Sequence, residues 1–211
     1  EGEMDFDISN TVPALAARTL DWAPDWCRCA RPEQDGIVYG FYPLWLDAGE
    51  RQIDFGALTR IGLYGVTVDE DGALRGPPGM EALAISDYLG SMMRAAHRYD
   101  VKVDWVVSRS DWAEWRTFTV KRKQEVLAAL GENIEDLLER EPPDGRQAMI
   151  RFASLGQDAG PTGGDGVVLY FRDFPGADKE LYNAFVADLY KRLDGMKPAR
   201  PLSIAVEYQE L

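Results

Sequence analysis

The sequence predicts an α/β protein built around a parallel sheet, and two observations support this prediction. Short runs rich in β-branched and aromatic residues alternate along the chain with longer segments of helical hydrophobic period, as they do when helices connect parallel strands. In addition, the stretch Asp165–Gly176 reads as a buried strand, Val167–Phe171, that ends in charged residues and a Pro-Gly turn. An amphipathic helix follows it almost at once. Units of this kind form (β/α) barrels, whose functional side chains lie at the carboxyl ends of the strands.

Five parallel strands are predicted. In chain order they cover Ile37–Trp45, Leu58–Val68, Val101–Val107, Val167–Phe171 and Pro201–Glu207. A closed barrel needs eight strands and usually about 250 residues. We therefore expect a TIM-type (β/α) barrel-like domain that is incomplete, or an open sheet of the same strands.

Three amphipathic helices are predicted between these strands. They cover Met80–His97, Phe118–Arg140, and a segment that follows Asp178, which is a suitable N-cap. A turn is expected at Asp69–Gly72. The segment Arg146–Leu155 is either an extra strand or part of an insertion, and the glycine-rich stretch Gln157–Asp165 is a loop.

The chain divides into an N-terminal arm, residues 1–35, and the partial barrel-like domain, residues 36–211. The arm carries a short helical pattern over Val12–Leu20. Trp22 and Trp26 are its expected anchors on the main domain, because large aromatic side chains dominate packing energetics.

Composition excludes several classes of function. The net charge of −13 argues against nucleic acid and against an anionic membrane surface, since both are bound by clustered Lys and Arg. No apolar run approaches the length of a membrane span. Cys27 and Cys29 are too close for an unstrained disulfide and too few for a metal site, so we expect neither a metal nor a cofactor.

Several segments resemble the glycoside hydrolase family 18 barrels, the chitinase-like enzymes. The strand Ile37–Trp45 is similar to that family's Gly-Tyr-Tyr-x-x-Trp strand, and Ile53-Asp54-Phe55 with Leu58–Val68 is similar to the segment that leads into its second strand. Asp165–Gly176 resembles the family signature Asp-Gly-x-Asp-x-Asp-x-Glu-Tyr-Pro-Gly. The resemblance covers about Ile37–Glu207 and implies the amino-terminal part of a TIM-type barrel.

The signature is degenerate at the positions that matter for hydrolysis. In the family its Glu protonates the glycosidic oxygen and the preceding Asp orients the substrate's acetamido group, which acts in place of a protein nucleophile. This chain has one extra residue in the motif, so two registers are open. Aligned on Asp-Gly, the inward positions are Val168, Tyr170 and Arg172. Aligned on Pro-Gly, they are Leu169, Phe171 and Asp173.

Either register breaks the catalytic set. Arg172 cannot serve as a general acid, because a guanidinium does not release its proton near neutral pH. Asp173 is the one candidate catalytic residue that remains. The residues expected to line a ligand cleft are aromatic or charged and follow the strands: Tyr42, Trp45, Trp112, Tyr170, Arg172 and Glu207. His97, the only histidine, is expected to be structural at a helix carboxyl end.

These observations favour a non-catalytic, glycoside-hydrolase-like module. Its expected partner is a glycan or oligosaccharide, and its expected context is a larger secreted or envelope protein, outside the cell or in the periplasm. Two alternatives stay open. One is a glycosidase that uses Asp173 or carboxylates outside this chain, and the other is a protein-interaction domain that pairs with the remainder of the barrel or with a partner protein.

Overall fold

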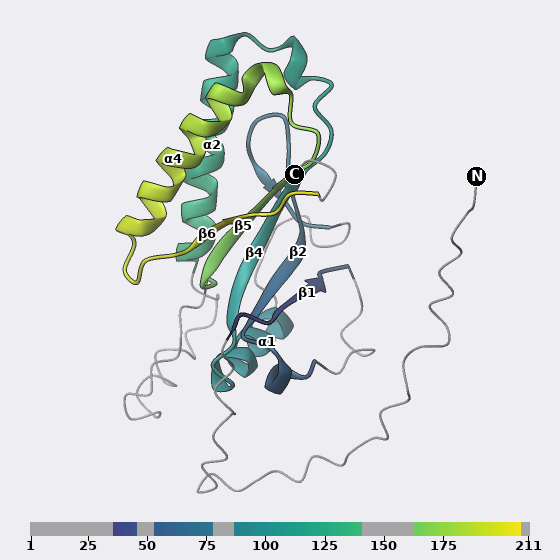
Figure 1. The fold of residues 1–211 in the computed structure, drawn as a ribbon, viewed down its shortest axis with the longest axis vertical. Helices are drawn as coiled ribbons and strands as arrows, with labels where there is room; N and C mark the ends of the chain where they lie inside the picture. The colour runs from purple at the N-terminus through teal and green to yellow at the C-terminus, as the bar shows by residue number, and fades with distance from the viewer. Residues whose placement is uncertain (1–35, 46–52, 78–86, 141–162, 208–211) are drawn as a thin grey trace, which may run out of the picture. The chain divides into compact units, whose positions relative to one another are not determined.

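A computed structural model describes residues 36–45, 53–77, 87–140 and 163–207 (Figure 1). The predicted arm lies outside these residues, with its helical pattern, its two tryptophans and its two cysteines. Outside them too lie Arg146–Leu155, most of the predicted loop Gln157–Asp165, and the first residues of the predicted helix Met80–His97.

Five strands run parallel in one sheet, in the order in which they occur along the chain. They are β1 (Tyr39–Pro43), β2 (Arg60–Val68), β4 (Lys102–Arg109), β5 (Gly166–Phe171) and β6 (Leu202–Ile204). Each strand predicted from the sequence is therefore confirmed. An additional strand, β3 (Leu74–Arg75), turns back after the Asp69–Gly72 turn and pairs antiparallel with the end of β2. Its two residues are too few to show a period in the sequence.

Three helices pack against a single face of this sheet. They are α1 (Asp87–Arg98), α2 (Val120–Glu139) and α4 (Lys179–Gly195). Figure 1 shows α2 and α4 side by side along the sheet, and the salt bridge between Arg192 and Glu135 joins them at 3.0 Å. Thr119 caps α2, because its hydroxyl oxygen accepts from the backbone N–H of Arg122.

Asp178 precedes α4 as predicted, but its side chain makes no capping hydrogen bond. Its carboxylate instead accepts from the Trp115 indole at 2.8 Å and from the Lys123 ammonium at 2.7 Å. The reason is that two stronger donors lie within reach on η4 (Trp115–Thr117) and α2. The residue therefore ties three segments together and does not cap one helix.

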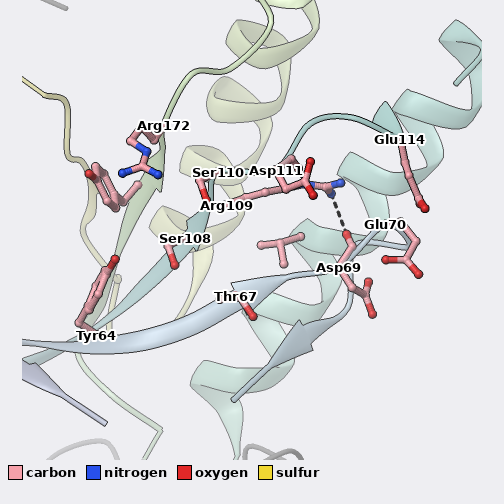
Figure 2. A pocket seen from close by; sticks show the side chains of 12 residues that line it. Tyr64, Thr67, Asp69, Glu70, Ser108, Arg109, Ser110, Asp111, Glu114 and Arg172 are labelled. Carbon is pink, nitrogen blue, oxygen red and sulfur yellow. Dashed lines mark hydrogen bonds between the residues drawn. The ribbon is translucent and has the colours of Figure 1, made fainter. Parts of the chain in front are cut away.

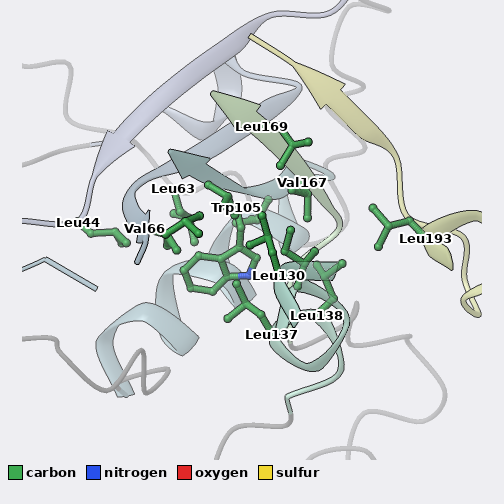
Figure 3. Close-up of a cluster of buried hydrophobic side chains, with 14 of the residues drawn as sticks. Leu44, Leu63, Val66, Trp105, Leu130, Leu137, Leu138, Val167, Leu169 and Leu193 are labelled. Carbon is green, nitrogen blue, oxygen red and sulfur yellow. The ribbon is translucent and has the colours of Figure 1, made fainter. Parts of the chain in front are cut away.

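The hydrophobic core lies between the helices and one face of the sheet (Figure 3). Trp105 of β4 is fully buried, and its indole N–H donates to the Gly163 carbonyl at 2.7 Å, so its polar atom is satisfied. The same cluster holds side chains from all three helices and from β1, β2, β4 and β5. They include Leu63, Leu130, Leu137 and Leu169.

A β-bulge in β2 gives the sheet an irregular alternation of side chains. Pairing with β4 shifts between Tyr64 and Val66, around Gly65, whose φ is +133°. Only glycine adopts this backbone conformation without strain. Because of the extra residue, Leu63 and Val66 both face the core, and Tyr64 and Thr67 both face the opposite side.

No described helix covers that opposite side, which we call the open face. At its amino end, Asp104 is only 2% exposed and is held by the guanidinium of Arg60 and the hydroxyl of Tyr39. Gly62 leaves room for this cluster, since a Cβ there would lie 2.7 Å from the Tyr39 hydroxyl oxygen. Burial raises the pKa of Tyr39, and the charge of Asp104 adds to this effect.

Candidate functional site

A pocket of about 390 Å³ lies at the carboxyl end of the open face (Figure 2). Its walls come from the ends of β2, β4 and β5 and from the loops that follow them. The lining residues are Tyr64, Thr67, Val68, Asp69, Glu70, Ser108, Arg109, Ser110, Asp111, Glu114, Tyr170 and Arg172. Since all three strands are parallel, their carboxyl ends meet at one edge, where (β/α) folds place functional groups.

One half of the pocket is lined by hydroxyls and aromatic rings. Tyr64, Ser108 and Tyr170 project from β2, β4 and β5 on the open face, and the rings of Tyr64 and Tyr170 lie 6.4 Å apart. The Ser108 hydroxyl donates to the Val66 carbonyl at 3.0 Å, so its oxygen remains able to accept. This half therefore presents acceptors beside apolar ring surface.

Arg172 and Glu207 stand at the edge of this hydroxyl-lined half. The Tyr170 hydroxyl donates to the Glu207 carboxylate at 2.8 Å. The hydrogen bond to Glu207 is the main reason that the pKa of Tyr170 is raised. The Nε atom of Arg172 lies 3.9 Å from the same carboxylate, and the Arg172 side chain is 48% exposed.

The other half of the pocket is acidic and is organised by Arg109. Its guanidinium donates to the backbone carbonyls of Asp69 (2.7 Å) and Asp111 (2.9 Å), and burial lowers its pKa. Burial raises the pKa of Asp69, but hydrogen bonds from the Ala73 backbone and from Arg75 outweigh it, so that this pKa is lowered overall. Asp69 is consequently ionised at neutral pH.

The side chains of β5 on the open face are those of the register aligned on Asp-Gly, not those of the register aligned on Pro-Gly. Val168 pairs with Val106 and Tyr170 pairs with Ser108, whereas Leu169 is fully buried in the core and Phe171 packs on Trp112. Arg172 lines the pocket and Asp173 does not. The Asp173 side chain is 75% exposed, 3.8 Å from the Arg172 Nε atom, with a backbone φ of +55°. Its catalytic role stays a prediction.

Four predicted cleft residues lie away from the pocket wall: Glu207, described above, and Tyr42, Trp45 and Trp112. Tyr42 is buried on the core face, opposite the pocket. Trp45 is 53% exposed and its ring contacts that of Tyr64 at 5.5 Å. Trp112 is 4% exposed, but it supports the site from beneath. Its indole N–H donates to the Arg172 carbonyl at 2.7 Å, and the Arg109 guanidinium lies over its ring at 4.8 Å.

Several pocket residues were not predicted from the sequence. Tyr64 and Thr67 face the pocket together only because of the bulge, and Gly65 within a strand pattern was the signal for it. Ser108 and Arg109 follow the predicted strand Val101–Val107, so the carboxyl-end rule could have identified them.

His97 is placed as expected of a structural residue. Its Nε2 lies 2.7 Å from the Asp165 carboxylate, which also accepts from the Val103 backbone N–H at 2.8 Å. This pair joins α1 to the start of β4 and of β5, far along the strands from the pocket. In the part of the chain that is described, no group of three metal-binding side chains gathers, and no helix is long and apolar enough to cross a membrane.

No protein-family model matches the sequence, and a search of curated proteins found no match either. Solved structures resemble it in part. A chitinase from Bacteroides thetaiotaomicron is 18% identical, with 81% of this chain and 47% of that chain covered and a TM-score of 0.47. Catalytic domain 2 of the Ostrinia furnacalis Group II chitinase is 16% identical, with 81% and 43% covered and a TM-score of 0.49. The chitinase domain of the Clostridium difficile spore coat protein CotE is 12% identical, with 83% and 43% covered and a TM-score of 0.48. The chain spans less than half the length of each, and the likeness is one of fold.

Proposed function

We propose that this chain binds an oligosaccharide in the pocket at the carboxyl end of its open face and does not hydrolyse it. The observation that carries this proposal is the identity of the open-face residues at the end of β5. They are Tyr170 and Arg172, a hydroxyl and a guanidinium, where a hydrolytic site would need a carboxylic acid.

The chemistry of the pocket suits a sugar. Saccharides offer closely spaced hydroxyls and apolar ring faces, and the pocket offers hydroxyls, charged groups and the rings of Tyr64 and Tyr170. Planar charged groups such as the Arg172 guanidinium make strong hydrogen bonds to such ligands. The exposed ring of Trp45, next to Tyr64, extends the aromatic surface beyond the pocket.

The carboxylates in the pocket are poorly suited to acid catalysis. A glycosidase acid keeps its proton near neutral pH because it is shielded from water. Asp69 has a lowered pKa, and Glu70, Asp111 and Glu114 are exposed. None of these described residues has the environment of such an acid.

Titration of the purified chain with chitin, cellulose and peptidoglycan oligosaccharides, followed by tryptophan fluorescence, tests the proposal. We expect a saturable change with one class of oligosaccharide, because Trp45 lies beside the pocket. Arg172→Gln should weaken the binding about tenfold, as expected for the loss of a charged hydrogen bond. The control Arg116→Gln changes an exposed arginine that does not line the pocket and should bind as the wild type does. No saturable change across the panel would refute the proposal.

A second candidate function is protein pairing at the sheet edges. Within the described residues, β1 and β6 each pair on one side only. Exposed apolar side chains accompany both strands: Ile37, Val38, Phe41, Ile204 and Val206. Such edges can pair with other strands. Light scattering tests this candidate, which predicts association that Phe41→Lys reduces; a monomer at all concentrations and in mixtures with candidate partners would count against it.

A further inference from the structure

We infer that Glu207 is a positioning residue of the pocket, which fixes the Tyr170 hydroxyl as a hydrogen-bond acceptor beside the Arg172 guanidinium. This inference rests on the oligosaccharide-binding function proposed above. Glu207 lies outside the pocket wall, but it determines which hydrogen bond the Tyr170 hydroxyl can make with a ligand.

The geometry supports an indirect role for Glu207. Glu207 follows β6 and does not line the pocket, whereas Tyr170 and Arg172, the two residues beside its carboxylate, both do. Its carboxylate oxygen Oε1 lies 2.8 Å from the Tyr170 hydroxyl and 3.9 Å from the Nε atom of Arg172. One carboxylate in the segment after β6 therefore lies beside two ligand-facing side chains of β5 and its loop.

The hydrogen bond sets the direction in which Tyr170 can act. A phenol has a single proton, and a carboxylate can only accept. When the Tyr170 proton is directed to Glu207, the lone pairs of its oxygen are left for the ligand, and the ligand must supply the donor. The raised pKa of Tyr170 agrees with a carboxylate that holds this proton.

Arg172 completes the arrangement, because a guanidinium only donates. Tyr170 and Arg172 together present an acceptor next to a donor. Two neighbouring hydroxyls of a sugar ring match this pair, since one hydroxyl donates to Tyr170 and the other accepts from Arg172. The pair therefore selects a ligand with adjacent hydroxyls of which one is free to donate.

The first test needs no ligand. Carbon-13 at the Cζ of tyrosine reports the ionisation of each ring, and Tyr170→Phe identifies the Tyr170 signal among the nine tyrosines. We expect Tyr170 to ionise at higher pH in the wild type than in Glu207→Ala. Asp173→Asn is the matched control. It removes a carboxylate at a similar distance from Arg172, 3.8 Å, which, unlike that of Glu207, accepts no hydrogen bond from Tyr170 in the described structure. Asparagine also tolerates the positive φ. An unchanged Tyr170 titration in Glu207→Ala would overturn the inference.

The second test is a double-mutant cycle in binding to the oligosaccharide that the wild type binds best. Glu207→Ala should weaken binding about tenfold, and about twofold or less when Tyr170→Phe is already present. Glu207→Gln should restore most of the affinity, because its amide oxygen still accepts from Tyr170. Additive effects would show that Glu207 does not act through Tyr170 and would overturn the inference alone. Failure of the wild type to bind any oligosaccharide would instead overturn the proposed function together with the ligand role inferred for Glu207.

Discussion

The two ends of the open face hold charges in opposite ways. At the amino end, Asp104 is almost fully buried, and Arg60 and Tyr39 supply hydrogen bonds to both of its carboxylate oxygens. At the carboxyl end, Arg172 is about half exposed and lies 3.8 to 3.9 Å from two carboxylates, too far for a direct hydrogen bond.

Because of this difference, we expect the amino end to contribute mainly to stability and the carboxyl end mainly to ligand binding. A buried, bidentate pair is costly to break, because either partner left alone is an uncompensated charge away from water. A loose, exposed pair contributes little to stability, and its charges remain available to a ligand. The same strands therefore carry a structural cluster at one end and a binding pocket at the other. Substitutions at the two ends should separate the two roles.

The largest effect is expected at the amino end. Asp104→Ala should lower the free energy of unfolding by about 3 kcal/mol, because it leaves the Arg60 charge only 21% exposed and without its partner. Chemical denaturation measures this loss. The control Glu125→Ala removes an exposed pair with Lys121 and should cost about 0.5 kcal/mol or less. Equal stability of the two variants would contradict a structural role for the Asp104 cluster.

The bulge in β2 gives the next largest effect. Gly65→Ala should cost about 2 kcal/mol, because alanine is strained at a φ of +133° and its Cβ would lie 3.3 Å from Leu44 and Trp45. The same substitution should weaken oligosaccharide binding, since the bulge sets the direction of Tyr64 and Thr67. The matched control is Gly195→Ala, where a Cβ meets no neighbouring atom. A Gly65→Ala variant as stable as this control would show that the bulge accommodates a side chain without strain, and would contradict the prediction.

A smaller effect should appear in the dependence of stability on pH. Burial raises the pKa of Asp165, but the hydrogen bonds from His97 and the Val103 backbone outweigh it, and the pKa lies below its ordinary value of 3.8. The unfolded chain therefore binds this proton more readily. The carboxylate contributes stability above about pH 4, and this contribution is lost as the pH falls through the folded-state pKa. Unfolding measured between pH 5 and 2 should be less steeply pH-dependent in Asp165→Asn and in His97→Gln than in the wild type. The same dependence of the free energy of unfolding on pH in both variants and the wild type would refute a stabilising role for the His97–Asp165 pair.

The smallest effect on stability is expected at the pocket itself. Arg172→Gln should change the free energy of unfolding by about 0.5 kcal/mol or less, because its ion pairs are long and half exposed. The same variant should lose about tenfold in oligosaccharide affinity. Thermal unfolding and binding, measured on one preparation, give both values. A large loss of stability would mean that the carboxyl end is also structural.

Strands and helices were predictable because hydrophobic period determines them. Each predicted strand is present, and the helix predicted over Phe118–Arg140 is found at Val120–Glu139. The role of Asp178 was not predictable, because its partners Trp115 and Lys123 are distant in sequence and only the tertiary fold brings them together.

The site was predictable in part. Tyr170, Arg172 and Glu207 were expected at strand ends and do lie together. Tyr42 and Trp112 were expected in the cleft for their aromatic character, but alternation along the strand and the packing of the following loop bury them on the core side. Sequence pattern identifies the end of a strand more readily than the face on which each side chain lies.

The most direct test of the account combines binding and turnover in one sample. The chain is saturated with the oligosaccharide that binds it, and the release of reducing ends is followed while the bound fraction is measured. We predict saturable binding that Arg172→Gln weakens, with no product beyond that of a protein-free control. Release of sugar in proportion to the concentration of the protein, abolished by substitution of a carboxylate such as Asp173, would contradict the proposal that the pocket binds its ligand without hydrolysing it.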